Sequence, residues 1–154
     1  MIFLECYNDE AVLRGLGVPK RNIEHEPGKS LVAEALLRSR HEQSIGLVDQ
    51  DPGAALPPYF REFKKVDELP KLRLVRYQHP KDKKWLVEIQ PDLEPWLYEA
   101  AKVASLKPKD FHLPESHRAL HDNPRAHAKH VKEFAEALVK AGSAHLCQLQ
   151  QWLG

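Results

Sequence analysis

The stretch that decides the fold is Ile45-Gly46-Leu47-Val48-Asp49-Gln50-Asp51-Pro52-Gly53. A short apolar run followed by two acids and a chain breaker predicts a buried strand that ends before Pro52. Because side chains two apart on a strand share a face, we expect Asp49 and Asp51 to lie together at the carboxyl end of this strand. Open α/β sheets place their ligand sites at that edge. Two close carboxylates favour a bound cation or a shared proton.

Strands and helices alternate before this stretch. The sequence predicts a strand at 2–4, a short helix capped by Asn8 or Asp9 and ended by Gly17, a weaker strand near 22–26, a helix that opens at Pro27, and the strand at 44–48. Such alternation over about fifty residues is typical of right-handed crossovers and a parallel sheet.

The chain after Gly53 predicts a loop, a hairpin and several helices. We expect a loop at 52–70 with one helical turn near 59–63, a hairpin of strands 72–77 and 85–89 at the sheet edge, a helix from Pro95, a helix opened by Asn123 and Pro124, and a last helix carrying Leu146, Leu149 and Leu153. The expected fold is a single α/β domain over 1–154. Its sheet is mostly parallel with helices on both faces, the core covers 1–105, and a helical cap covers 106–154.

Composition is ordinary for one globular domain. The 154 residues are 42% hydrophobic and 29% charged. Glu5 interrupts the only early apolar run and no stretch is long enough for a membrane span, so we expect the protein to stay in the cytosol. Two cysteines, Cys6 and Cys147, are too few for a disulfide framework, and we expect both to be reduced.

The net charge of +1 gives no overall attraction to nucleic acid, but the charge is unevenly distributed. Residues 61–84 carry 9 basic and 4 acidic groups. One interpretation is a phosphate-binding surface that includes Lys64, Lys65, Arg73 and Arg76. The other is a solvated face with a hairpin tip made soluble by lysine. The sequence leaves both open.

Acidic residues also follow the first predicted strand. Glu5 and Asp9 flank its turn into the first helix, so that Glu5, Asp49 and Asp51 all fall at the carboxyl ends of adjacent parallel strands. As an alternative, Asp9 is a helix cap and Asp51-Pro52-Gly53 an ordinary turn. Glu5 has no obvious capping role, because it directly follows three apolar strand residues.

These motifs resemble a known family. A strand ending in Glu with an Asp four residues on, a Gly-Lys helix start at 28–29, and a strand ending in Asp-x-Asp are similar to the Toprim domain of topoisomerases, primases and overcoming-lysogenization-defect nucleases. The resemblance covers roughly residues 1–55. It implies a Toprim-like fold and metal-dependent phosphodiester chemistry.

The resemblance also implies roles for individual residues. Glu5 would be a general acid or base or a metal ligand, and Asp49 with Asp51 would hold Mg²⁺ or Mn²⁺. Asp9 or Glu94 would assist a second metal, since Leu93-Glu-Pro-Trp-Leu97 resembles a segment of the nuclease branch. Hard cations of this kind prefer carboxylate oxygens.

Two further residues qualify the resemblance. Lys29 would contact nucleic-acid phosphate or be a surface lysine, because the complete phosphate-loop pattern is missing: Ile23 stands where its first glycine belongs. Cys6 replaces the glycine that usually follows the first-strand Glu, and its side chain would narrow the approach of a phosphate.

The sequence thus predicts a metal-dependent nuclease, with phage or mobile-element defence as its setting. The alternative is a catalytically silent Toprim-like protein that binds a larger nuclease or ATPase partner, and a third reading is a small-molecule phosphohydrolase. The pairs His117 with His121 and His127 with His130 have spacings that suit zinc, but the sequence favours exposed or core-edge histidines over a metal site.

Overall fold

The computed structural model describes all residues from Met1 to Gly154, and its contacts divide the chain into two compact units. The first unit comprises 1–6 and 21–92, and the second comprises 7–20 and 93–154. This division differs from the expected boundary between core and cap after residue 105. The assignment of 1–154 to a single domain stays a prediction.

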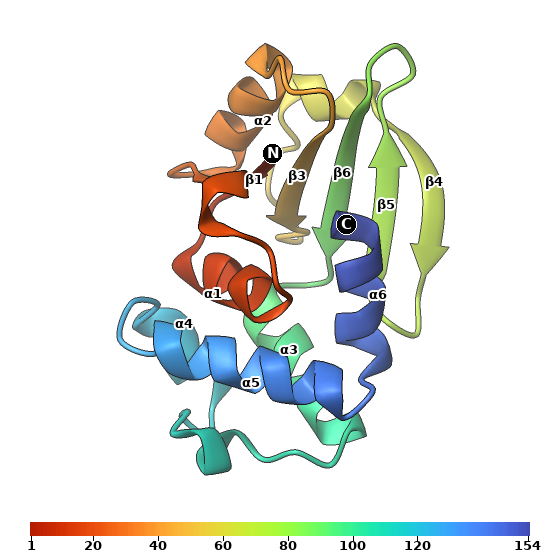
Figure 1. Ribbon diagram of the computed structural model, residues 1–154. Coiled ribbons are helices and arrows are strands. Elements are labelled where there is room, and N and C mark those ends of the chain that lie inside the picture. The colour runs from red at the N-terminus through yellow and green to blue at the C-terminus, as the bar shows by residue number, and fades with distance from the viewer. The chain divides into compact units, whose positions relative to one another are not determined.

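The first unit contains a six-stranded sheet with the order β2-β1-β3-β6-β5-β4. Its strands are β1 (Ile2–Leu4), β2 (Ile23–His25), β3 (Ser44–Asp49), β4 (Lys64–Leu69), β5 (Leu74–Gln78) and β6 (Lys84–Ile89). The neighbouring strands β2, β1, β3 and β6 pair in parallel. Strand β5 is antiparallel to β6, and β4 is antiparallel to β5. Figure 1 shows β3 and β6 side by side with their arrowheads pointing the same way. The α/β class and the mostly parallel sheet are confirmed.

The hairpin of β5 and β6 forms as predicted, but its position at the sheet edge was wrong. Strand β6 lies between β3 and β5, and the edge strand is β4, which falls in the segment expected to be a loop. Four of the six residues of β4 are exposed, so it lacks the alternating apolar pattern of a half-buried strand. The helical turn expected near 59–63 is the short 3₁₀ helix η2 (Pro58–Glu62).

Helix α2 (Lys29–Arg38) packs on β1 and β3. It begins after Gly28, so Pro27 precedes the helix and does not open it. A Cβ on Gly46 would lie 3.2 Å from Leu86 and 3.3 Å from Leu36, which shows how closely helix and strands approach. The buried cluster beneath α2 comprises Phe3, Val32, Ala33, Leu36, Val48, Phe60, Phe63 and Leu86.

The second unit is helical. It contains α1 (Tyr7–Gly15), α3 (Leu93–Val103), η3 (Pro108–Phe111), α4 (His117–Asp122), α5 (Ala128–Lys140) and α6 (Ala144–Leu153), and η1 (Lys20–Asn22) begins at its boundary. No helix of the chain combines the length and the apolar character that crossing a membrane requires.

Several predicted helix starts were wrong. Helix α1 begins at Tyr7, so Asn8 and Asp9 lie inside its first turn and are not caps. Helix α5 begins at Ala128, because residues 124–127 form a turn that follows the separate helix α4, whose cap is Ser116. Helix α3 begins at Leu93 and carries Pro95 in its first turn. The N–H groups of a first turn have no partner within the helix, so the N–H that proline lacks costs no helical hydrogen bond.

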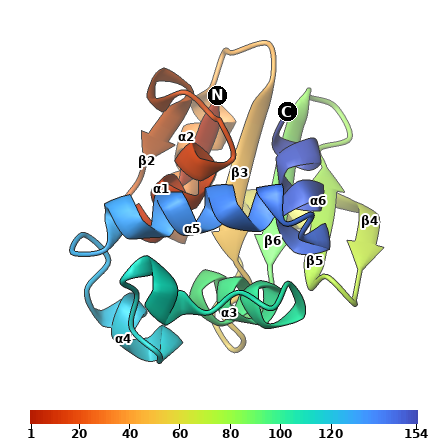
Figure 2. The same ribbon diagram turned by 60° about the horizontal axis from the view of Figure 1, so that its bottom comes forward.

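Helices α1 and α5 lie side by side, as Figure 2 shows. They approach closely at Gly15, where a Cβ would lie 2.6 Å from the Lys132 carbonyl oxygen and 2.7 Å from the Ala135 Cβ. No real side chain fits at such distances. The missing side chain of Gly15 therefore sets the separation of the two helices.

Candidate metal centre

The carboxyl ends of β3 and β6 are held together by backbone hydrogen bonds. Asp49 is the last residue of β3 and pairs in register with Ile89, the last residue of β6. Beyond the strands, Gln50 N–H donates to the Ile89 carbonyl (2.8 Å) and Asp51 N–H donates to the Pro91 carbonyl (3.3 Å). These bonds carry the strand pairing into the loops, so the residue after Pro91 is brought beside Asp51.

That residue is Asp92, and it completes a cluster of three carboxylates. Asp49, Asp51 and Asp92 each place one carboxylate oxygen within 4.8 Å of the others, and all three side chains are half-buried. Like charges this close repel unless a cation or a proton lies between them. Carboxylate oxygens are the preferred ligands of Mg²⁺ and Mn²⁺, so this donor set fits a hard divalent cation.

Asp51 reaches this position from a turn and not from a strand. The strand ends at Asp49, and Asp51 has a φ of 47° in the left-handed region, which aspartate tolerates better than most residues. Its carbonyl accepts a hydrogen bond from Ala54 N–H (2.9 Å), and Gly53 inside this turn has a φ of 88°. The expected proximity of Asp49 and Asp51 is found, although the strand-face reasoning behind it does not apply.

Lys29 supplies a positive charge next to the cluster. Its Nζ lies 3.4 Å from Asp51 Oδ2 and donates to the Gln50 carbonyl (3.2 Å). The Lys29 side chain is only 13% exposed, so it is not a solvated surface lysine. As the first residue of α2, it ties the start of that helix to the end of β3.

Glu5 follows β1 and belongs to the same electrostatic environment. Burial raises the pKa of Glu5, and the negative charge of Asp51 raises it further, whereas Lys29 and a hydrogen bond from the Asp49 backbone N–H lower it. The second oxygen, Oε1, is buried without a hydrogen-bond partner. A buried acceptor left unsatisfied is costly, so this carboxyl favours a proton or a bound cation.

Asp9 and Glu94 lie in the second unit. Glu94, 2% exposed, accepts a hydrogen bond from Asn8 Nδ2 (3.1 Å), and its Oε1 lies 3.4 Å from His121 Nδ1. The same Asn8 amide donates to the Leu120 carbonyl, so these contacts join α1, α3 and α4. Asp9 is also buried. Their assistance to a second metal stays a prediction.

The four basic residues of the predicted nucleic-acid surface fall into two classes. Arg76 donates through Nε to Asp67 (3.0 Å) and lies over the Trp85 ring, and Lys65 pairs with Glu68 (3.0 Å). Lys64 and Arg73 are exposed. Charges already matched by a carboxylate attract a phosphate less, so Lys64 is a better candidate for a phosphate contact than Lys65 or Arg76.

Cys6 does not distort the backbone where the resembling family carries glycine. It is absent from the non-glycine residues with positive φ, so this position does not require a glycine. Cys6 and Cys147 are half-buried and form no disulfide. His117 and His121 of α4 are exposed, and no histidine belongs to the group of three potential metal ligands.

Asp92 is the functional candidate that the sequence analysis missed. It follows β6 by three residues, as Asp51 follows β3 by two. The signal was an acid after the end of a strand, but the strand at 85–89 was expected in a hairpin at the sheet edge, and its pairing with the strand at 44–48 was not predicted. Its parallel pairing with β3 could not be read from periodicity alone.

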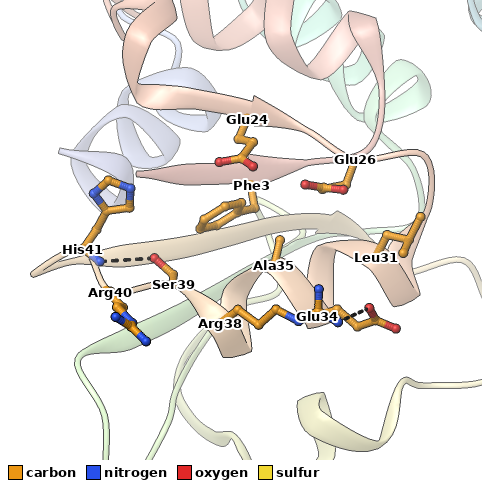
Figure 3. Close-up of a pocket in the computed structure, with 10 residues that line it drawn as sticks. All are labelled: Phe3, Glu24, Glu26, Leu31, Glu34, Ala35, Arg38, Ser39, Arg40 and His41. Carbon is orange, nitrogen blue, oxygen red and sulfur yellow. Dashed lines mark hydrogen bonds and ion pairs between the residues drawn. The ribbon is translucent and has the colours of Figure 1, made fainter.

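The first unit also contains a pocket of about 400 Å³ between β2 and α2, drawn in Figure 3. The ring of Phe3 and the side chain of Ala35 form its apolar wall. Its charged residues are Glu24, Glu26, Glu34, Arg38 and Arg40. Arg38 pairs with Glu34 (3.2 Å). The mixture of signs gives this pocket no strong preference for an anion or a cation.

Comparisons with known proteins give no relative. No family model matches the chain, and neither the curated proteins nor the solved structures contain a significant match.

Proposed function

We propose that the protein hydrolyses phosphodiester bonds of nucleic acid with a divalent cation, in the manner of Toprim-like nucleases. The observation that carries the proposal is the meeting of Asp49, Asp51 and Asp92 at the ends of two parallel strands. Glu5, at the end of the neighbouring strand β1, adds a carboxyl next to them.

Mg²⁺ or Mn²⁺ would be held by these three aspartates, and when bound it would neutralise charge on a phosphate and make water a better nucleophile. The residues of the chain supply the remaining functions. Glu5, whose pKa is raised by burial, holds a proton at higher pH than an ordinary glutamate and would transfer one to or from the reacting oxygens. Lys29 would turn from Asp51 to a phosphate oxygen when substrate binds.

Nucleic acid is the proposed substrate because the resembling family acts on it and because exposed Lys64 and Arg73 carry the charge that a phosphate backbone requires. Defence against phage or mobile DNA is the proposed setting. The cytosol is the proposed location.

A second candidate is the catalytically silent interaction protein, and one contact favours it. The Lys29 ammonium lies 3.4 Å from Asp51 and neutralises part of the charge that a metal would otherwise neutralise. In this candidate Lys29 takes the place of the cation, and the fold serves to bind a larger nuclease or ATPase.

Calorimetric titration with MnCl₂ separates the two candidates. The nuclease proposal requires Mn²⁺ binding by the wild-type protein that is lost in Asp92→Asn and kept in Asp110→Asn, which removes an exposed acid of η3. It also requires Mn²⁺- or Mg²⁺-dependent cutting of single-stranded or duplex DNA or RNA. If Mn²⁺ binds to the Lys29→Met variant but not to the wild-type protein, the Lys29 ammonium occupies the place of the cation, and this result would favour the silent candidate.

A further inference from the structure

The second unit contains a pocket with a charge opposite to that of the metal centre. It has a volume of about 460 Å³ and lies between α1 and α5. Its lining includes a single acid, Glu10. The basic residues that line it are Arg14, Lys20, Arg125, Lys129 and Lys132. Five cations against one carboxylate give this pocket a positive potential that attracts anions.

The basic charge is mostly uncompensated within the chain. Lys132 pairs with Glu136 (3.7 Å), whereas Arg14, Lys20 and Lys129 form no ion pair. The amino end of α5 adds to the positive potential, since its cap residue His127 makes no side-chain hydrogen bond to the helix. Such a helix start offers backbone N–H groups to an anion.

The pocket also offers a planar surface. The Arg125 guanidinium carbon lies over the Tyr7 ring, 4.2 Å from its centroid, and Arg125 donates a hydrogen bond to the Tyr7 hydroxyl. Arg125 is exposed, so this cation–π pair is accessible to a ligand. Nucleobases stack on aromatic rings and on arginine planes of this kind. The aliphatic stems of the lysines and Ala11 form apolar walls beside the pair.

We propose that the α1–α5 pocket binds one nucleotide of a single-stranded nucleic acid, with its phosphate at the lysines and its base on the Tyr7–Arg125 pair. A single strand fits better than a duplex, because a base must leave its stack to reach a planar surface inside a pocket. The inference rests on the proposed function in one respect: it takes nucleic acid as the ligand. It requires neither a metal nor hydrolysis.

Strand binding is measured by fluorescence anisotropy in EDTA, with a labelled single strand of about 20 nucleotides, as DNA and as RNA. The variant is Lys20→Glu with Lys129→Glu, and both residues are exposed. The matched control is Lys107→Glu with Lys109→Glu, which makes the same charge change at exposed positions of the same unit. We expect the variant to weaken binding about tenfold or more, the control to change it less than about twofold, and the salt slope to fall by about 0.7, the value for one phosphate, only in the variant.

Three results would overturn the proposal. Equal weakening by the variant and the control would show a general charge effect. A duplex, a nucleoside monophosphate or poly-glutamate that competes as well as the unlabelled strand would show a different ligand. Unchanged binding in Tyr7→Leu would show that no base stacks on the pair.

Failure of the proposed function gives a different pattern. Strand binding in EDTA that depends on Lys20 and Lys129, without cutting in Mn²⁺, sinks the nuclease proposal and leaves this inference standing. Cutting at the wild-type rate by Lys20→Glu with Lys129→Glu, at strand concentrations below saturation, sinks only this inference.

Discussion

Glu5 and Glu94 are both withdrawn from solvent, yet their surroundings differ. Glu94 accepts a hydrogen bond from Asn8 and lies beside His121, so its contacts join three helices of the second unit. Glu5 leaves Oε1 buried without a partner, in a site where burial and Asp51 raise its pKa. A buried carboxylate with hydrogen-bond partners can stabilise the fold. A buried carboxylate that lacks a partner and lies beside other acids destabilises the folded state, and a bound cation or proton would remove this cost. The contacts of Glu94 favour a structural role for that residue, and the surroundings of Glu5 support its proposed role in the metal centre.

The largest expected effect is on the structural side of this comparison. Glu94→Ala leaves the Asn8 amide short of an acceptor and opens a space in the helical unit, and we expect a loss of about 2 to 4 kcal/mol in the free energy of unfolding. Urea denaturation measures it. Glu115→Ala, at an exposed position of the same unit, is the control and should change stability by less than about 0.5 kcal/mol. A loss that small in Glu94→Ala would end the structural assignment.

The next effect concerns the carboxylates of the three-aspartate cluster. Asp92→Asn and Asp49→Asn each remove one charged ligand, and we expect Mn²⁺ affinity to fall at least about tenfold while the metal-free fold is kept. Calorimetry gives the affinity, and circular dichroism checks the fold. Wild-type affinity in Asp92→Asn would remove this residue from the site.

Glu5→Gln tests the comparison through the direction of its effect on stability at different pH values. A carboxyl whose pKa is raised in the folded state stabilises the fold fully below its unfolded pKa and loses this contribution as pH rises through the folded value. Glutamine imitates the protonated form, so Glu5→Gln should be more stable than the metal-free wild type near pH 8 and the difference should vanish near pH 4. Thermal melting at several pH values tests this, and a destabilised Glu5→Gln at pH 8 would contradict the account.

The smallest effect is expected at the basic residues of β4 and β5 that pair with a carboxylate. Because Arg76 is matched by Asp67 and Lys65 by Glu68, we expect Lys65→Ala to weaken nucleic-acid binding less than about twofold and Lys64→Ala to weaken it more. Anisotropy at low salt measures both variants. The reverse order would show that the pairing does not decide which lysines contact phosphate.

Much of the parallel sheet could be predicted, because short stretches of sequence specify its strands and the turns that end them. The apolar run ending at Asp49 and the alternation before it follow from periodicity and turn chemistry. Strand β4 could not be predicted from the sequence. It is an exposed edge strand that begins with Lys64 and Lys65, so its residues do not show the alternating apolar pattern of a half-buried strand. Which strand lies beside β3 is decided by long-range pairing that carries no local signal.

The same distinction holds at the site. Glu5, Asp49 and Asp51 could be proposed from their places at strand ends, whereas the position of Asp92 depends on β6 lying beside β3. The helix starts were misplaced because Pro27 and Pro124 mark the vicinity of a helix and not its first residue. The caps predicted at Asn8 and Asp9 failed because tertiary contacts bury both side chains.

The most direct test of the metal centre is a crystal structure of the protein soaked in MnCl₂, read at the manganese absorption edge. We predict an anomalous peak within coordination distance, about 2.2 Å, of oxygens from Asp49, Asp51 and Asp92, with the Lys29 ammonium displaced from Asp51. Well-ordered carboxylates without a peak, and Lys29 still on Asp51, would contradict the account.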